Sequence, residues 1–126
     1  MLLFEGGKSL DINESITQEG IEGTKRFLDH FGMLNPKRKA SIADRKTIYI
    51  EKSAWVRAKA SGLFHGLTAV GTQVEKGQVL ATISDPYGKV EYKVKAPNAG
   101  HIINVNDAPI VYQGDAIFHI TTALEL

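Results

Sequence analysis

The sequence predicts a mainly β fold: a compact barrel- or sandwich-like β domain with an internal pseudo-twofold repeat, preceded by one strand and one helix left from an α/β domain. Short runs of β-branched and apolar residues, separated by Gly or Pro roughly every 8 to 12 positions, continue from Ile48 to the C-terminus. This stretch also matches itself at a distance of 36 or 37 residues. We therefore expect a strand–helix region at residues 1–34, a basic linker at 35–47 and a C-terminal β domain at 48–126.

The composition is that of an ordinary cytoplasmic globular protein. The 126 residues include 15 basic and 14 acidic side chains, a formal net charge of +1, so neither nucleic acid nor a membrane is an expected partner. The absence of cysteine excludes disulfides, a thiol nucleophile and cysteine-ligated metal sites. The apolar start at Met1 meets Glu5 too soon to form a signal peptide or a membrane span.

The first expected element is a short buried strand. Leu2, Leu3 and Phe4 form a continuous apolar run that ends at Glu5. Such a run is typical of a strand that is buried on both faces of a parallel sheet. A buried strand needs neighbours and no strand pattern precedes this one, so we expect its partners to belong to a missing part of the domain.

The second expected element is an amphipathic helix that ends at Gly32. Either Asp11 with Glu14 or Ser15 with Gln18 has the spacing of a capping box at the start of the helix. The residues that share one helical face are Ile16, Gly20, Gly23, Phe27, Leu28 and Phe31. Each of the two glycines lowers helix propensity by roughly 1 kcal/mol relative to alanine, so we expect another segment to pack closely against them.

The linker region, residues 35–47, has few large apolar side chains. Its basic residues are Lys37, Arg38, Lys39, Arg45 and Lys46. No aromatic residues are interleaved with them, which favours a solvated connector over a nucleic-acid or partner surface.

The β region consists of two similar halves. In the first half, Gly62 is followed by a turn at Gly77 and an apolar strand; in the second half, Gly100 is followed by a turn at Gly114 and a similar strand. Two copies of this unit can cover each other's apolar face. We expect the repeated glycines to provide positive φ angles or close strand approach, not ligand contacts.

Few patterns in the chain indicate catalysis. None of the four histidines, His30, His65, His101 and His119, forms a His-x-x-Glu or Glu-x-x-His pair. A metal site assembled across strands from His65 and His101 is a second interpretation beside two ordinary strand histidines, and His119 is expected on one face of a sheet. The chain has no Gly-x-Ser-x-Gly elbow and no phosphate-binding glycine loop.

Glu5 is the main candidate for a catalytic side chain. It stands at the carboxyl end of the expected buried strand, where open α/β sheets place functional groups, and the two glycines that follow would let other groups approach. Position alone favours a functional carboxylate and a solvated strand-end glutamate equally.

The repeated β pattern resembles the hammerhead-like fold of biotinyl and lipoyl carrier domains. The resemblance rests on the Gly-Gln-Val-Leu turn at 77–80 and the Ala-Pro-x-x-Gly turn at 96–100. These carriers bear the modified lysine at the tip of the hairpin between their halves, and here Lys89 follows a Pro-containing turn at 84–88. A carrier domain modified at Lys89 is therefore an alternative function.

A second resemblance covers nearly the whole chain. The segments that carry it are 3–7, 27–34, 55–58, 61–64, 74–78, 85–88 and 114–120. In this order they resemble the C-terminal part of the succinylglutamate desuccinylase/aspartoacylase family. That family is similar to zinc carboxypeptidases, in which an α/β zinc domain is followed by a smaller β domain that shapes access to the site.

The resemblance implies a zinc-dependent hydrolase that deacylates an N-acyl amino acid or a similar small amide. In the family, a strand-end glutamate acts as general base and passes the proton to the leaving amine, and Glu5 matches that position. Residues 1–34 would then be a remnant of the zinc-peptidase-like α/β domain. The expected substrate, a small N-acylated amino acid, would bind through the missing catalytic domain.

The chain departs from the family in lacking its zinc ligands. In the family a His-x-x-Glu pair and a later histidine precede the matched region, so zinc is expected in the full-length family and none bound by this chain. The family's substrate-binding arginines also lie upstream, so the resemblance assigns no such role to Arg26, Arg38, Arg45 or Arg57. We expect the chain to be a C-terminal piece, an engineered fragment or a short gene product, that is inactive alone.

Two further expectations concern association. The apolar residues of the strand–helix region would be exposed without the missing domain, which predicts a homo-oligomer formed through residues 1–34. A non-catalytic assembly module is another alternative, although the long helical heptads typical of membrane-fusion adaptors are absent.

Overall fold

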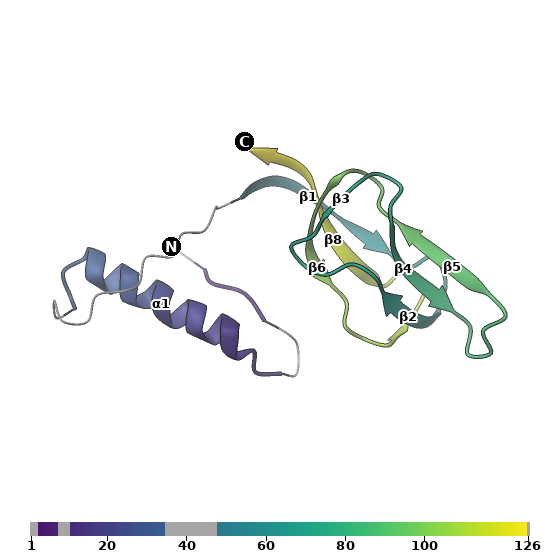
Figure 1. The fold of residues 1–126 in the computed structure, drawn as a ribbon, viewed down its shortest axis with the longest axis horizontal. Helices are drawn as coiled ribbons and strands as arrows, with labels where there is room; N and C mark the ends of the chain where they lie inside the picture. Colours follow the sequence, from purple (N-terminus) through teal and green to yellow (C-terminus); the bar gives the residue numbers. More distant parts are fainter. Residues whose placement is uncertain (1–2, 8–10, 35–47, 126) are drawn as a thin grey trace. The chain divides into compact units, whose positions relative to one another are not determined.

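The computed structural model describes residues 3–7, 11–34 and 48–125. The chain divides into two compact units, Met1–Lys46 and Thr47–Leu126, called the helix unit and the β unit below (Figure 1). The architecture is mainly β with one helix, as the sequence predicts. The expected basic linker, residues 35–47, lies outside the described residues. In the described part of the chain, no helix has the length and apolarity needed to cross a membrane.

Helix α1 spans Glu14–His30 and begins at a different cap from the two predicted. Its N-cap is Asn13, whose side-chain oxygen accepts a hydrogen bond from the Ile16 N–H at 3.3 Å and one from the Ser15 hydroxyl at 2.7 Å. Asparagine is among the best N-cap residues because its short side chain reaches the free N–H groups of the first turn. Both capping-box predictions were therefore wrong.

The C-terminus of α1 is formed as predicted. Gly32 has a φ of +65° and its N–H donates to the Asp29 carbonyl at 2.9 Å. The N–H of Met33 donates to the Leu28 carbonyl at 2.9 Å. These two hydrogen bonds form a Schellman motif, which requires a left-handed residue at the position that Gly32 occupies.

The expected strand at the start of the chain does not form within the described residues. Leu3 and Phe4 belong to an irregular segment, and Leu2 lies outside the described residues. No described strand of the helix unit is available to pair with this segment, and unpaired backbone groups do not make a sheet. Leu3 and Phe4 are also exposed, contrary to the expectation of burial on both faces.

Segment 3–7 nevertheless packs against α1. A Cβ atom at Gly20 would lie 3.1 Å from the Phe4 ring, and one at Gly6 would lie 3.0 Å from the Ile16 side chain. The predicted close approach is therefore confirmed at Gly20. At Gly23 it is not, because the nearest neighbouring atom there is the Arg26 guanidinium at an ordinary 3.7 Å.

The β unit contains two four-stranded antiparallel sheets (Figure 1). Its strands are β1 Tyr49–Arg57, β2 Gly62–Gly66, β3 Gln73–Val74, β4 Val79–Ser84, β5 Glu91–Lys95, β6 Gly100–Val105, β7 Ile110–Val111 and β8 Ala116–Glu125. One sheet has the order β1-β8-β6-β3 and the other has the order β5-β4-β2-β7. The sheets of the described residues do not close into a barrel, so the barrel alternative was wrong.

The two short strands connect the predicted halves. Strand β3 pairs with β6, placing Gln73 opposite His101, and β7 pairs with β2, placing Ile110 opposite Leu63. Each short strand is therefore bonded to a long strand of the other half. Neither half forms its sheet alone.

Both sheets contribute to one apolar core. The largest fully buried side chains are Phe118, Leu80, Ile83, Ile102, Ile117, Ile120, Val74, Val111 and Thr121. The Thr121 hydroxyl accepts a hydrogen bond from the His101 N–H at 2.8 Å, so this buried polar group is satisfied. The core belongs entirely to the β unit.

The repeated glycines have structural roles, as predicted. A Cβ atom at Gly62 would collide with the Ser84 carbonyl oxygen, and one at Gly100 would collide with the Thr121 carbonyl oxygen. The other two, Gly77 and Gly114, have φ angles of +84° and +96°, a region that L side chains rarely adopt.

Candidate functional site

Glu5 is positioned by the contacts of its two neighbours. The Phe4 ring lies against Gly20, and Gly6 lies against Ile16, so the residues on both sides of Glu5 approach α1. Glu5 itself is exposed, and no hydrogen bond or ion pair joins it to another described residue. Among the described residues, the Glu5 carboxylate is therefore exposed and has no polar side chain bonded to it.

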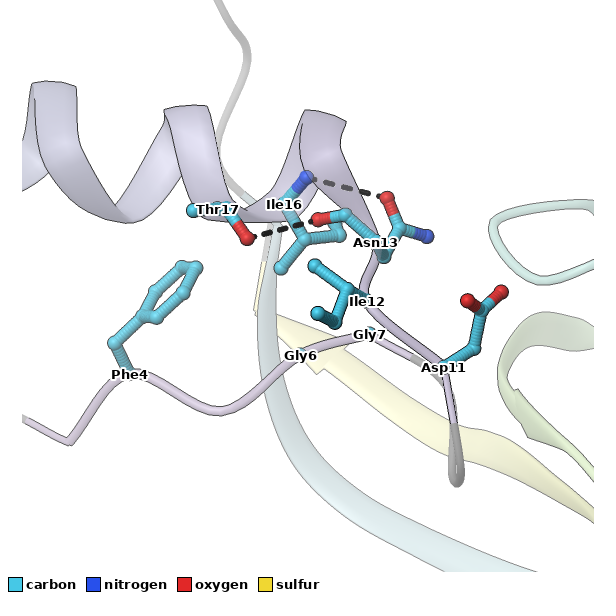
Figure 2. A pocket seen from close by; sticks show the side chains of 8 residues that line it. All are labelled: Phe4, Gly6, Gly7, Asp11, Ile12, Asn13, Ile16 and Thr17. Atoms are coloured by element: carbon cyan, nitrogen blue, oxygen red, sulfur yellow. Dashed lines mark hydrogen bonds between the residues drawn. The ribbon is translucent and has the colours of Figure 1, made fainter.

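A shallow pocket of about 320 Å³ lies between segment 3–7 and the start of α1 (Figure 2). It is lined by Phe4, Gly6, Gly7, Asp11, Ile12, Asn13, Ile16 and Thr17. Figure 2 shows the hydrogen bonds that Asn13 accepts from Ile16 and Thr17, so both oxygens of Asn13 are already used by the helix. Among the described residues that line the pocket, Asp11 is the one with a titratable side chain, and Glu5 is not among them. The described lining therefore contains no acid–base pair.

The histidines do not form a metal site. His65 belongs to β2 and His101 to β6, and these strands are in different sheets. The described residues contain no group of three or more His, Asp or Glu side chains placed to hold a metal ion. His101 Nδ1 is buried without a hydrogen-bond partner, but it belongs to no such group within the described part of the chain. The described residues therefore do not present the three or four protein ligands that a zinc site needs.

His119 lies on one face of its sheet, as predicted, and is part of a small polar–aromatic cluster. Its ring stacks on that of Trp55 in the neighbouring strand, with centroids 4.2 Å apart and an angle of 9° between the planes. His119 Nε2 is 2.8 Å from the Ser53 hydroxyl. No local sequence pattern indicates this cluster, because only the register of β1 against β8 places Trp55 opposite His119.

Lys89 lies in the exposed β4–β5 hairpin. Asp85 closes the turn: its N–H donates to the Val90 carbonyl at 3.1 Å, and its side chain accepts from the Val90 N–H at 2.9 Å. The Lys89 amine is 6.0 Å from the centre of the Tyr87 ring. The hairpin is an ordered turn that presents an exposed lysine.

The four arginines to which the resemblance assigns no substrate-binding role lie in different parts of the chain. The Arg57 guanidinium donates to the Gly114 carbonyl at 2.8 Å and so holds the end of β1 against the turn before β8. Arg38 and Arg45 lie outside the described residues. Arg26 is on α1 and interacts with a neighbouring group.

Known proteins resemble this chain both in sequence and in fold, although no family model matches it. Its sequence is 28% identical over 125 residues to N-alpha-acetyl-L-2,4-diaminobutyric acid deacetylase of Halomonas elongata, covering 95% of this chain and 35% of the deacetylase.

Solved structures match the fold. A succinylglutamate desuccinylase/aspartoacylase family protein from Shewanella amazonensis superposes with a TM-score of 0.75 at 19% identity, covering 91% of this chain and 33% of that protein. The ectoine utilization protein EutE (DoeB) from Ruegeria pomeroyi superposes with a TM-score of 0.74 at 19% identity, covering 87% of this chain and 34% of that protein.

The chain matches the C-terminal part of succinylglutamate desuccinylase/aspartoacylase family proteins. This confirms the resemblance carried by the ordered sequence segments. The chain spans about a third of the length of these relatives. Its own residues therefore account for only a part of any site that the complete relatives contain.

Proposed function

We propose that this chain is the C-terminal part of a zinc-dependent amidohydrolase that deacylates a small N-acylated amino acid or a similar amide in the cytoplasm. The observation that carries the proposal is the similarity to a deacetylase along 95% of the chain. Fold similarity to desuccinylase/aspartoacylase proteins over the helix unit and the β unit together supports the same family of reactions. The acyl group and the amino acid remain to be measured, because a fold does not fix a substrate.

The zinc ion of this proposal is held by residues outside the chain. The described residues contain no group of three side chains that could bind a metal ion. The zinc ligands would therefore come from a polypeptide like the one that the relatives have in addition to the third that matches this chain. We accordingly propose that the 126-residue chain is inactive alone.

Glu5 is the residue of this chain that would take part in the reaction. As general base it would take a proton from the water that attacks the amide carbonyl, and it would then pass that proton to the nitrogen of the leaving amine. Its exposed carboxylate and the small residues Gly6 and Gly7 beside it are compatible with approach by a substrate. The rest of the site would face Glu5 from the upstream polypeptide.

The finer architecture of the β unit belongs to the same proposal. We propose that its halves form a pseudo-twofold, hammerhead-like repeat. The matching roles of Gly62 and Gly100, and the exchange of β3 and β7 between halves, support it. In this arrangement the β unit is a rigid scaffold, not a carrier of a mobile group.

The test is a single-chain fusion in which this chain replaces the matching third of the Halomonas elongata deacetylase. Hydrolysis of N-acetyl-diaminobutyrate, N-acetyl-aspartate and N-succinyl-glutamate would be measured with zinc supplied. Glu5→Gln is expected to lower kcat by a factor of about 10² to 10⁴, the usual contribution of a general base, while KM changes little. Asp11→Asn, a matched change of another exposed carboxylate in the helix unit, is the control.

Two results would contradict the proposal. Full activity of the Glu5→Gln fusion would remove Glu5 from the mechanism. Amide hydrolysis by the 126-residue chain alone, with stoichiometric zinc, would show that the chain holds a complete site. A covalent group on Lys89, detected as a mass of the purified chain above that of its sequence, would instead support the carrier function.

A further inference from the structure

Strand β5 is an exposed edge of the β unit (Figure 1). It stands at the end of the order β5-β4-β2-β7, so among the described strands only β4 is hydrogen-bonded to it. Four of its five residues are exposed, and none of them is proline. An edge strand of this kind presents a row of unpaired N–H and C=O groups to which another strand can bond.

The backbone hydrogen bonds at the two ends of β5 show which residues face its open edge. The Val90 carbonyl accepts from the Asp85 N–H at 3.1 Å, and the Ala96 N–H donates to the Gln78 carbonyl at 2.9 Å. The backbone groups of Val90 and Ala96 therefore point to the same side as β4. This direction alternates along an antiparallel strand, so the odd-numbered residues of β5 point their N–H and C=O groups away from β4.

The first two of these odd-numbered residues carry opposite charges. The strand begins Glu91-Tyr92-Lys93, and neither Glu91 nor Lys93 forms an ion pair or a side-chain hydrogen bond with a described residue. The residues opposite them on β4 are the neutral Ser84 and Thr82. A negative and a positive side chain placed symmetrically about Tyr92 are complementary to a second copy of the same strand.

We propose that β5 pairs antiparallel with β5 of a second copy of this chain, with Tyr92 opposite Tyr92 of that copy. This register places each Glu91 opposite a Lys93, so two ion pairs form across the junction. The outward N–H and C=O groups of the same residues bond to each other, because opposite residues at such positions exchange both hydrogen bonds. The sheets of the two copies that contain β5 become one continuous sheet. This inference does not depend on the proposed function.

Charge selects this register over the neighbouring ones. A shift in one direction that keeps the faces of the strands matched puts Lys93 opposite Lys93, and the same shift in the other direction puts Glu91 opposite Glu91. Like charges directly opposite each other destabilise a strand pair, whereas opposite charges stabilise it. In the proposed register Lys95 lies opposite Lys89, but Lys89 belongs to the exposed turn outside β5.

Apolar side chains on the other face of β5 favour the same register. Tyr92 is 50% exposed and Val90 is 44% exposed, although Val94 on the same face is buried in the core. In the proposed pair the two Tyr92 rings meet, and each Val90 lies opposite a Val94. The rings occupy a position without backbone hydrogen bonds between the two copies, where the side chains of an antiparallel pair come closest. Aromatic cross-strand pairs stabilise such contacts.

The dimer is expected to form only at high protein concentration. The junction joins residues 90–94 of each copy, whereas stable interfaces use about 20 to 30 residues from each partner. Sedimentation equilibrium of the 126-residue chain tests this. The mean mass should rise from one chain toward two between about 10 μM and about 1 mM, because small interfaces associate weakly.

Charge-reversal variants test the register. Glu91→Lys alone and Lys93→Glu alone each place like charges at both ends of the junction, so each variant is expected to stay monomeric. An equimolar mixture of the two variants restores opposite charges, and so does the double variant Glu91→Lys/Lys93→Glu; both are expected to dimerise. Lys52→Glu is the control, because Lys52 is an exposed residue of β1, the edge strand of the other sheet.

Amide hydrogen exchange provides a second readout. The N–H groups of Glu91 and Lys93 should exchange more slowly as the concentration of the unaltered chain rises, while that of Tyr92, which faces β4, stays the same. Thermal melts of the variants should match that of the unaltered chain, because both altered side chains are exposed. A variant with an unchanged midpoint and no dimer has lost the junction and not its fold.

Three results would overturn the proposal. The first is a monomeric mass at every concentration. The second is a dimer that persists in both single variants, which would assign association to another surface such as residues 1–34. The third is a mixture of the two folded single variants that remains monomeric, because the Tyr92-centred register requires the mixed pair to form.

Discussion

The two units of this chain differ in how far they bury their own apolar residues. The β unit buries twelve hydrophobic side chains in one core that both sheets share. The described residues of the helix unit include no buried side chain, although they carry three exposed phenylalanines. The β unit therefore has an apolar core of its own, whereas the described residues of the helix unit do not form one.

Removing the largest core side chain gives the largest expected contrast between the units. Phe118→Ala should lower the free energy of unfolding of the β unit by about 3 to 5 kcal/mol, because it removes apolar contacts and leaves a cavity. Phe27→Ala, the same change in the helix unit, should alter it by less than about 0.5 kcal/mol. Urea unfolding followed by Trp55 fluorescence measures both. Similar losses would contradict the independence of the β unit.

A glycine change sharpens the account of the β unit. Gly62→Ala should cost about 1 to 3 kcal/mol of unfolding free energy, because the new methyl group would collide with the Ser84 carbonyl oxygen. The control is Gly66→Ala on the same strand, where the nearest neighbouring atoms are 3.8 and 4.0 Å away and little change is expected. Thermal melts compare the two. Equal midpoints would show that β2 can shift to admit a side chain.

The smallest expected effect concerns the cap of α1. Asn13→Ala removes the side-chain acceptor of the Ile16 N–H and should destabilise the helix by about 1 kcal/mol. Amide hydrogen exchange of the first helical turn should become faster, while exchange in β4 and β8 stays the same. Asp11→Asn, which lies outside the helix, is the control. Faster exchange throughout the β unit would link the two units, contrary to this comparison.

Local patterns were reliable where one short segment decides the structure. The helix itself, its termination at Gly32 and the onset of strands after Ile48 all follow from neighbouring residues, and all were predicted correctly. The N-cap was missed because several residues before α1 can cap a helix, and the actual starting point selects Asn13 among them. The strand at Leu3 and Phe4 was missed because an apolar run forms a strand only where a partner supplies hydrogen bonds.

The candidate site was predictable only in part. Glu5 stands out in the sequence, and segment 3–7 holds it between two contacts with α1. The sequence pattern does not reveal whether any group faces that carboxylate, and no described residue forms a hydrogen bond or an ion pair with it. The stacking of Trp55 on His119 could not be predicted from the sequence either, since the two residues are far apart in the chain and meet only through strand register.

Sequence alone was enough to establish a mainly β fold, the helix and its end, the structural use of the repeated glycines, and the resemblance to the deacylase family. These depend on local stereochemistry and on the order of short motifs. Three-dimensional packing was needed to pair β3 and β7 with strands of the opposite half, to leave the sheets unclosed and to separate His65 from His101. Such pairings join residues distant in the chain, and their free energy comes from burying a common core, which no local pattern encodes.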